Sequence, residues 1–149
     1  MAIVWKNLET VLKNYDALIR KVEVQIRKNL NKTADAVQAR MIENVSLTDH
    51  TMEDLARLGH PYSRRNPRPP HSPPWLVHIR SGDLKRSIKR SKIKGSKNPK
   101  VLIGADENIA EHARKVIFGD SKVMARDFVS GTITEMTREI WRKMTRMPD

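Results

Sequence analysis

Residues 8–45, LETVLKNYDALIRKVEVQIRKNLNKTADAVQARMIENV, decide the fold of this 149-residue chain. Apolar side chains recur from Leu8 to Val45 at steps of three and four residues, which is the spacing of an amphipathic helix. No Gly or Pro occurs between Met1 and Met52, so nothing in the sequence forces a break. We therefore predict one long amphipathic helix over this stretch.

The predicted helix is longer than a domain of this size. A continuous helix from Asn7 to Val45 would run about 58 Å at 1.5 Å per residue. A compact chain of 149 residues has a diameter of only roughly 40 Å. The helix must therefore kink near Asn29–Asn31, project from the domain, or lie against a neighbouring chain. A hydrophobic content of 38% indicates a thin core and favours the neighbour.

The rest of the chain divides into a helix, an arm and a sheet region. A short helix is expected from Thr51 to Leu58, because Thr51 can cap it and Gly59 can end it; it completes a helical N-terminal part, residues 1–58. Residues 59–74 hold six of the eight prolines, which fix φ and remove backbone donors. We expect an extended Pro/Arg-rich arm there.

Residues 75–149 are predicted to form the sheet and a C-terminal helix. Trp75–Arg80 is expected as a short strand, and Ile88–Lys94 with Lys100–Gly104 as a β-hairpin. Ala110–Phe118 is compatible with either helix or strand. Apolar residues from Val129 to Met147 indicate a C-terminal amphipathic helix. The order predicts one α+β domain, residues 1–149, in which the long N-terminal and the C-terminal helix pack on a small antiparallel β-sheet.

The net charge is concentrated in one segment. Residues 57–100 contain thirteen Lys and Arg and a single acid, Asp83, so they account for the whole net charge of +12. Such a segment favours an acidic partner, which can be a nucleic acid, the acidic face of a protein or a membrane. No apolar run approaches the roughly 20 residues that a membrane-spanning helix needs, so we expect no membrane partner. The N-terminus lacks a secretory signal pattern, which favours the cytoplasm.

No pattern of catalytic residues is evident. The chain has no cysteine, and none of its five histidines has the i, i+4 spacing of a helical zinc pair. Phosphate-binding glycine motifs and the G-x-S-x-G nucleophile motif are also missing from the sequence. We expect no catalytic residue, no metal site and no cofactor, and therefore a protein that is not an enzyme.

The basic segment has three interpretations. Its cations can neutralise phosphates, which would make the chain a nonspecific nucleic-acid-binding protein that uses residues 57–100. Its Arg-Pro arm can dock on an acidic protein, because a stiff arm loses little conformational entropy on binding. The charge can also only keep an oligomer in solution. The favoured protein-partner surface consists of Arg64, Arg65 and Arg68 in the arm and of Arg80, Arg86, Lys89 and Arg90 beyond it.

Three short motifs follow one another in the second half of the chain. Residues 81–88, SGDLKRSI, resemble the T-G-x-L-x-x-S-I signature of the tail-completion and head–tail joining (neck) proteins of tailed bacteriophages. Residues 112–120, HARKVIFGD, are similar to that family's Y-A-x-x-V-E-F-G-T element, and residues 125–128, ARDF, to its A-R-P-F element. This chain departs from the motifs at Ser81, His112, Asp120 and Asp127.

The resemblance implies a structural virion protein. Such a protein forms a homo-oligomeric ring, expected to be a hexamer, at the neck or as a tail terminator at the top of the tail. It joins the tail tube to the head-side connector, contacts the adjacent neck and tail-tube proteins, and can touch genomic DNA that passes through the lumen. Assembly would take place in the host cytoplasm. The structural motif residues would be Gly82 in a tight turn, Leu84 and Ile88 in the core, Gly119 at the end of a third strand, and Phe128 as the anchor of the last helix.

Overall fold

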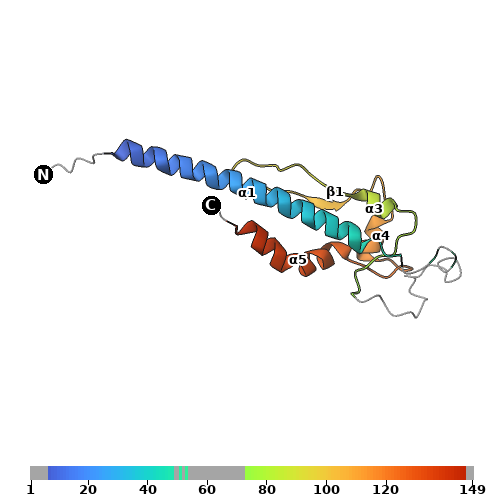
Figure 1. The fold of residues 1–149 in the computed structure, drawn as a ribbon. Coiled ribbons are helices and arrows are strands. Elements are labelled where there is room, and N and C mark those ends of the chain that lie inside the picture. The colour runs from blue at the N-terminus through green and yellow to red at the C-terminus, as the bar shows by residue number, and fades with distance from the viewer. Residues whose placement is uncertain (1–6, 49–50, 52, 54–72, 147–149) are drawn as a thin grey trace.

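The computed structural model describes residues 7–48, 51, 53 and 73–146. Its elements in chain order are α1 (Leu8–Asn44), α3 (Asp83–Ser87), β1 (Ile88–Arg90), β2 (Ile103–Ala105), α4 (Ala113–Phe118) and α5 (Phe128–Met144). Two long helices that pack together and a small two-stranded antiparallel sheet make an α+β fold, as predicted. α5 lies along one side of α1, and the hairpin of β1 and β2 lies along another side (Figure 1).

α1 is one uninterrupted helix of 37 residues, which confirms the predicted long helix. At 1.5 Å per residue it is about 56 Å long. Its helical hydrogen bonding continues through Asn29–Asn31, so no break separates the two halves. The helix ends at Val45, whose backbone N–H donates to the carbonyl oxygen of Met41 at 3.2 Å. The expected kink near Asn29–Asn31 is therefore wrong. In the single chain the first half of the helix projects from the domain (Figure 1), and its packing against a neighbouring chain stays a prediction.

The hydrophobic core lies at the C-terminal end of α1. Val37, Met41 and Val45 of this end are each at most 3% exposed, and Phe128 at the start of α5 is completely buried. Other core residues come from the stretch before α3, from α3 and β1, and from the region of α4 and α5: Val77, Leu84, Ile88, Ala110, Ala113 and Met136. The predicted burial of Leu84 and Ile88 is therefore confirmed, and Phe128, expected as the anchor of the last helix, is buried as well.

α5 runs antiparallel to α1 and is held to it by polar contacts at both ends. Near its start, Thr132 Oγ1 accepts a hydrogen bond from Asn44 Nδ2 at 2.9 Å. Beyond its end, the carbonyl oxygen of Arg146 accepts one from Asn29 Nδ2 at 2.7 Å. Asp127 caps the helix by accepting from the Ser130 backbone N–H at 2.9 Å. The two asparagines thus fix the register of the helix pair.

The hairpin follows a tight turn and a single short helix. Gly82 has φ +82°, a left-handed conformation that glycine adopts at no steric cost, as predicted for this turn. β1 and β2 pair antiparallel, with Ile88 opposite Ala105 and Arg90 opposite Ile103. Toward the tip only Lys94 and Lys100 pair again. The predicted hairpin is therefore present, with strands shorter than expected.

One expected strand is wrong. Trp75–Arg80 forms only an isolated parallel bridge between His78 and Leu47, because the chain touches the end of α1 there and bends away. The sequence leaves Ala110–Phe118 open between helix and strand, and Ala113–Phe118 is helix α4, so Gly119 ends a helix instead of the third strand that the resemblance implied. The segment is helical because Ala113, Val116 and Ile117 are spaced three and four residues apart and pack on the same core.

The remaining sequence expectations concern parts that the structure does not describe. The expected arm lies outside the described residues up to residue 72, and so do its arginines Arg64, Arg65 and Arg68. The expected helix from Thr51 to Leu58 also lies outside them, apart from Thr51 and Glu53.

A glycine in the first turn of α5 allows close packing, and alanine should disturb it. A Cβ built on Gly131 would lie 2.2 Å from Cγ of Trp75. Gly131→Ala should therefore destabilise the fold by roughly 1–3 kcal/mol, against the usual gain from Gly to Ala in a helix. Urea unfolding followed by circular dichroism measures this. Gly104→Ala is the matched control, because its Cβ would meet nothing within 4 Å; equal stability of the two variants would contradict the prediction.

The ion pair between α1 and α5 should make stability depend on acidic pH. Arg40 donates hydrogen bonds to Glu135 and lowers the pKa of that carboxyl from 4.5. The folded state therefore prefers the charged carboxylate, and this contribution is complete above the unfolded pKa and is lost as pH falls through the lower folded pKa.

Glu135→Gln should consequently destabilise the protein at neutral pH by on the order of 1 kcal/mol, and the difference from wild type should vanish in acid. Denaturant titrations at several pH values measure the difference. Glu139→Gln is the control, since the Glu139–Lys143 pair lies on the surface of α5 alone. A difference that persists unchanged in acid would count against the assigned role of Glu135.

Candidate assembly surface

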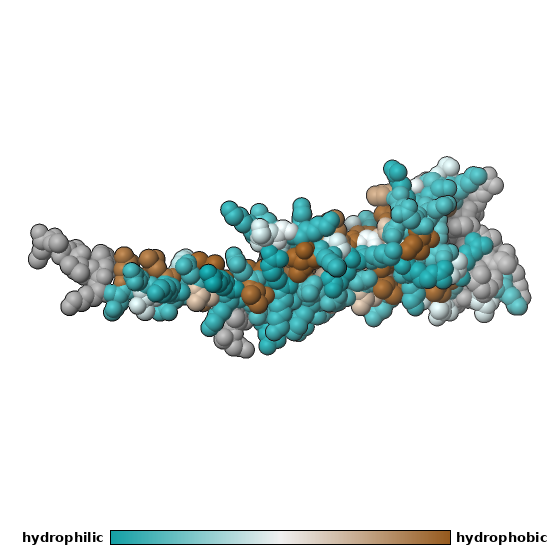
Figure 2. All heavy atoms as spheres, turned by 90° about the horizontal axis from the view of Figure 1, so that it is seen from above, coloured by the Kyte–Doolittle hydropathy of each residue, from teal (hydrophilic) through white to brown (hydrophobic). Residues whose placement is uncertain are grey.

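The N-terminal half of α1 carries an apolar face that no described part of the chain covers. Residues 7–21 are all exposed, and packing begins only at Val22. At a 100° turn per residue the apolar side chains fall on one side of the helix. Figure 2 shows apolar residues along the part of α1 that stands clear of the body. The members of this apolar tip face, each 40–62% exposed, are Leu8, Val11, Leu12, Tyr15, Leu18, Ile19 and Ile26.

The tip is exposed because the hairpin and α5 both stop short of it along α1. The hairpin loop reaches α1 only as far as Arg27, whose Nη2 donates to the carbonyl oxygens of Gly95 and Ser96, both at 2.9 Å. The C-terminal end of α5 reaches α1 only as far as Asn29, whose Nδ2 also donates to the Met144 carbonyl oxygen at 3.4 Å. From residue 26 back to residue 8, a length of about 28 Å, α1 extends past both.

The apolar tip face continues the face that α5 covers. Its spacing of four and three residues from Leu8 to Ile26 leads directly to Asn29 and Thr33, which are buried. Further along the same side, Asn44 holds α5. A single stripe therefore runs the length of α1, covered in its second half and uncovered in its first.

Other exposed apolar side chains are scattered. Trp141 and Ile133 lie on α5, Phe118 ends α4, and Leu102 precedes β2. Single exposed apolar residues are normal on soluble proteins and need no partner. Among residues 7–48 and 73–146, such residues gather in a continuous row only at the tip of α1.

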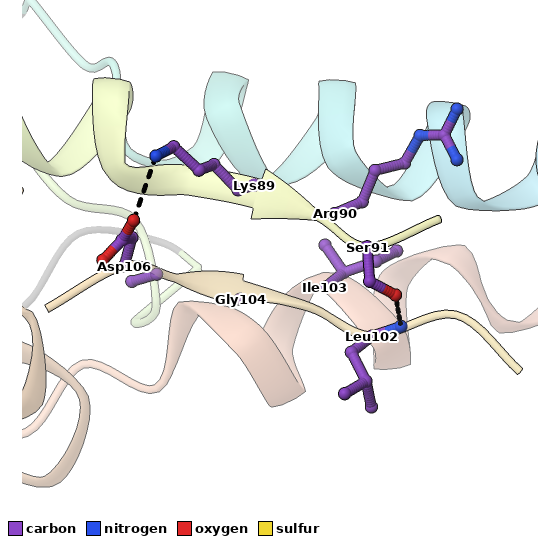
Figure 3. Close-up of a pocket in the computed structure, with 8 residues that line it drawn as sticks. Lys89, Arg90, Ser91, Leu102, Ile103, Gly104 and Asp106 are labelled. Atoms are coloured by element: carbon purple, nitrogen blue, oxygen red, sulfur yellow. Dashed lines mark hydrogen bonds and ion pairs between the residues drawn. The ribbon is translucent and has the colours of Figure 1, made fainter. Parts of the chain in front are cut away.

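Three members of the predicted partner surface form ion pairs with acids of the same chain. Lys89 Nζ lies 3.0 Å from Asp106 Oδ2 across the hairpin (Figure 3). Arg86 pairs with Asp83 inside α3. Arg90 Nε lies 2.7 Å from Asp35 Oδ1, which ties β1 to α1.

The acids of two of these pairs have lowered pKa values. For Asp106 the main cause is the hydrogen bond from Lys89, followed by those from Asn108. For Asp83 the largest cause is the hydroxyl of Ser81, followed by Arg86. Both shifts come from ion pairs and hydrogen bonds within the chain. Arg86 and Lys89 themselves remain exposed, so their contact with a partner stays a prediction.

Other lysines of the basic segment are available to a partner. Arg80 is exposed beside the turn before α3. Within the part of the chain that the structure describes, five exposed lysines of α3 and the hairpin make no ion pair: Lys85, Lys92, Lys94, Lys97 and Lys100. We call them the basic hairpin surface; they belong to the basic segment, residues 57–100, and their binding to a partner stays a prediction.

The hairpin also bears a shallow hollow. The hollow has a volume of about 350 Å³ and is lined by residues 89–91 and 102–106 (Figure 3). Leu102 donates its backbone N–H to Ser91 Oγ at 3.0 Å, so this hydroxyl braces the hairpin. Residues 7–48, 51, 53 and 73–146 contain no group of three or more His, Asp or Glu side chains that could hold a metal ion. None of the helices in these ranges is long and apolar enough to span a membrane.

One buried arginine was not singled out by the sequence. Arg126 is 3% exposed, and its Nη1 donates to the carbonyl oxygen of Pro74 at 3.0 Å. Its backbone N–H donates to the carbonyl oxygen of Val116 at 2.6 Å, which joins residues 125–128 to α4. Composition carries no signal for this role, because arginine is normally exposed.

Comparison of the chain with protein-family models, with curated proteins and with solved structures gave no match. The assignment of function therefore depends on the surfaces described above and on the three motifs.

Removing Arg90 should weaken the fold itself. Besides Asp35, it reaches Asn31 Oδ1 at 3.0 Å, so it fastens β1 to α1 twice. Arg90→Ala should cost about 1 kcal/mol of unfolding free energy. Lys92→Ala, two residues along the same hairpin, should change it by less than about 0.5 kcal/mol. Thermal or urea unfolding compares the two, and equal effects would contradict the assignment.

Proposed function

We propose that this chain is a structural protein that assembles with copies of itself into a ring. The observation that carries the proposal is the apolar tip face of α1, which no described part of the chain covers. A row of seven exposed apolar residues along about 28 Å of helix is costly in water, and a neighbouring copy can remove it from water.

We further propose that the ring is a joint in the neck of a tailed bacteriophage, between the tail tube and the head-side connector. This location rests on the motifs at residues 81–88, 112–120 and 125–128. The three segments meet in one hydrophobic core, to which they contribute Leu84 and Ile88, Ala113, and Phe128. The backbone N–H of Arg126 also donates to the carbonyl oxygen of Val116. Short motifs that are distant in sequence and meet in space support a common structural element.

A second candidate function is nonspecific nucleic-acid binding. The observation that favours it is the basic hairpin surface, whose five lysines are exposed and unpaired within the described ranges. Lysines of this kind bind phosphates without reading bases, and such binding weakens steeply with salt. A DNA mobility shift at low and high salt, together with mass in solution, separates the candidates: strong salt-dependent binding by a monomer supports this function and contradicts the ring.

The assembly role should depend on the tip and not on the stability of the body. Leu12→Ser with Ile19→Ser removes two members of the apolar tip face, and both side chains are exposed in the single chain. The double variant should keep the melting temperature of the monomer yet lose assembly in light scattering and rings in negative-stain micrographs. Val24→Ser is the matched control, because Val24 is 66% exposed and lies on the opposite side of α1.

The control should assemble like wild type. Normal rings from the double variant would show that another surface holds the copies together. A wild-type chain that stays monomeric at all concentrations would remove the main support for the proposed ring.

A further inference from the structure

The edges of the apolar tip face carry opposite charges. One edge is a column of acids, one per two turns, formed by Glu9, Asp16 and Glu23. The other edge is a column of one amide and two ammonium groups, formed by Asn14, Lys21 and Lys28. All six side chains are exposed, and within the described ranges none of them takes part in an ion pair.

This arrangement distinguishes between the two directions in which a second α1 can pack. Two antiparallel copies place like edges together, so that acids face acids and lysines face lysines. Two parallel copies place the acidic edge of one against the Lys21 and Lys28 edge of the other. Opposite charges attract and like charges repel across such an edge, as at the flanking positions of coiled coils.

We propose that the apolar tip face binds the same face of further copies of this chain, with all α1 helices parallel and in register. The inference rests on the proposed function for its homo-oligomer and names the surface and direction of that contact. Rotation about an axis along the helices keeps every helix pointing the same way, so a parallel contact is compatible with a ring.

The width of the apolar tip face indicates how many neighbouring α1 helices each copy contacts. The row Leu12, Ile19 and Ile26 and the row Leu8, Tyr15 and Val22 make the two-row seam of a coiled coil. Val11 and Leu18 add a third row on one side. A face of three rows is broader than a two-stranded seam, so each helix contacts more than one neighbour.

The position of α5 limits the length of the contact. From Asn29 onward α5 occupies the same side of α1, as its bonds to Asn29 and Asn44 show. The copies therefore touch from Leu8 to about Lys28 and diverge from Asn29 onward, where the C-terminal end of α5 covers this side of α1. The bodies then stand around a narrow helical tip.

Cysteine cross-linking tests the direction directly, because the chain has no cysteine of its own. Leu8→Cys, Tyr15→Cys and Val22→Cys are made as three separate variants of the full chain and oxidised mildly. In a parallel, in-register contact each residue meets its own equivalent, so all three should give covalent dimers on non-reducing gels. Ala17→Cys, on the opposite side of the same helix, is the control and should give at least several-fold less dimer.

Light scattering of the same samples separates the possible failures. An oligomer in which only one of the three variants cross-links has antiparallel helices, and an oligomer in which none does uses another surface. Either result overturns this inference and leaves the proposed ring standing. A monomer overturns both.

A charge exchange tests the edges. Asp16→Lys with Glu23→Lys makes both edges basic, and Lys21→Glu with Lys28→Glu makes both edges acidic. Each double variant alone should assemble at least several-fold more weakly than wild type, and an equal mixture should recover assembly. Assembly of either variant at the wild-type concentration would contradict the role of the edges.

Discussion

The limited reach of α5 along α1 is the constraint on which the rest of this structure depends. α1 spans 37 residues, whereas α5 spans 17 and meets it only between Asn44 and Asn29. The hairpin, on another side, ends at nearly the same level, at Arg27. One helix therefore has two environments: a second half enclosed by its own chain, and a first half whose surroundings must come from elsewhere.

The polar contacts between the helices matter more for position than for strength. An apolar stripe alone would allow α5 to slide along α1, because aliphatic side chains pack in several registers. Asn44 bonded to Thr132 and Asn29 bonded to the carbonyl of Arg146 are satisfied in one register only. The same two residues thereby determine where the covered part of α1 ends and how much of the apolar face remains exposed.

The sequence predicted the features that depend on local pattern. The long helix followed from periodicity without Gly or Pro, and the burial of Leu84, Ile88 and Phe128 followed from the motifs that contain them. It failed where tertiary contacts decide. The sequence left α4 open between helix and strand, and the packing of Ala113 and Val116 on the core decides for helix. Trp75–Arg80 is not a strand, because among the described residues it pairs only with the chain just after α1, at Leu47.

The candidate site was only half predictable for a related reason. The sequence located an assembly surface in the basic segment, yet Lys89 and Arg90 have acidic partners, Asp106 and Asp35, that are 17 and 55 positions away. No local pattern shows such pairs. The excess length of α1 was visible from the start, because it needs only a residue count and a rise per residue. The exposed tip of α1 could therefore be predicted from helix length alone.

The hydrogen bonds of Arg27 and Asn29 also hold α1 near its middle, so that its first half extends without support. A pull along the helix axis at Leu8 would strain the contacts with α5 and with the hairpin together, in shear, so that they must fail at once. A sideways push on the same tip would instead concentrate bending at these hydrogen bonds, one contact at a time. We therefore expect α1 to resist a pull along its axis better than a sideways push on its tip.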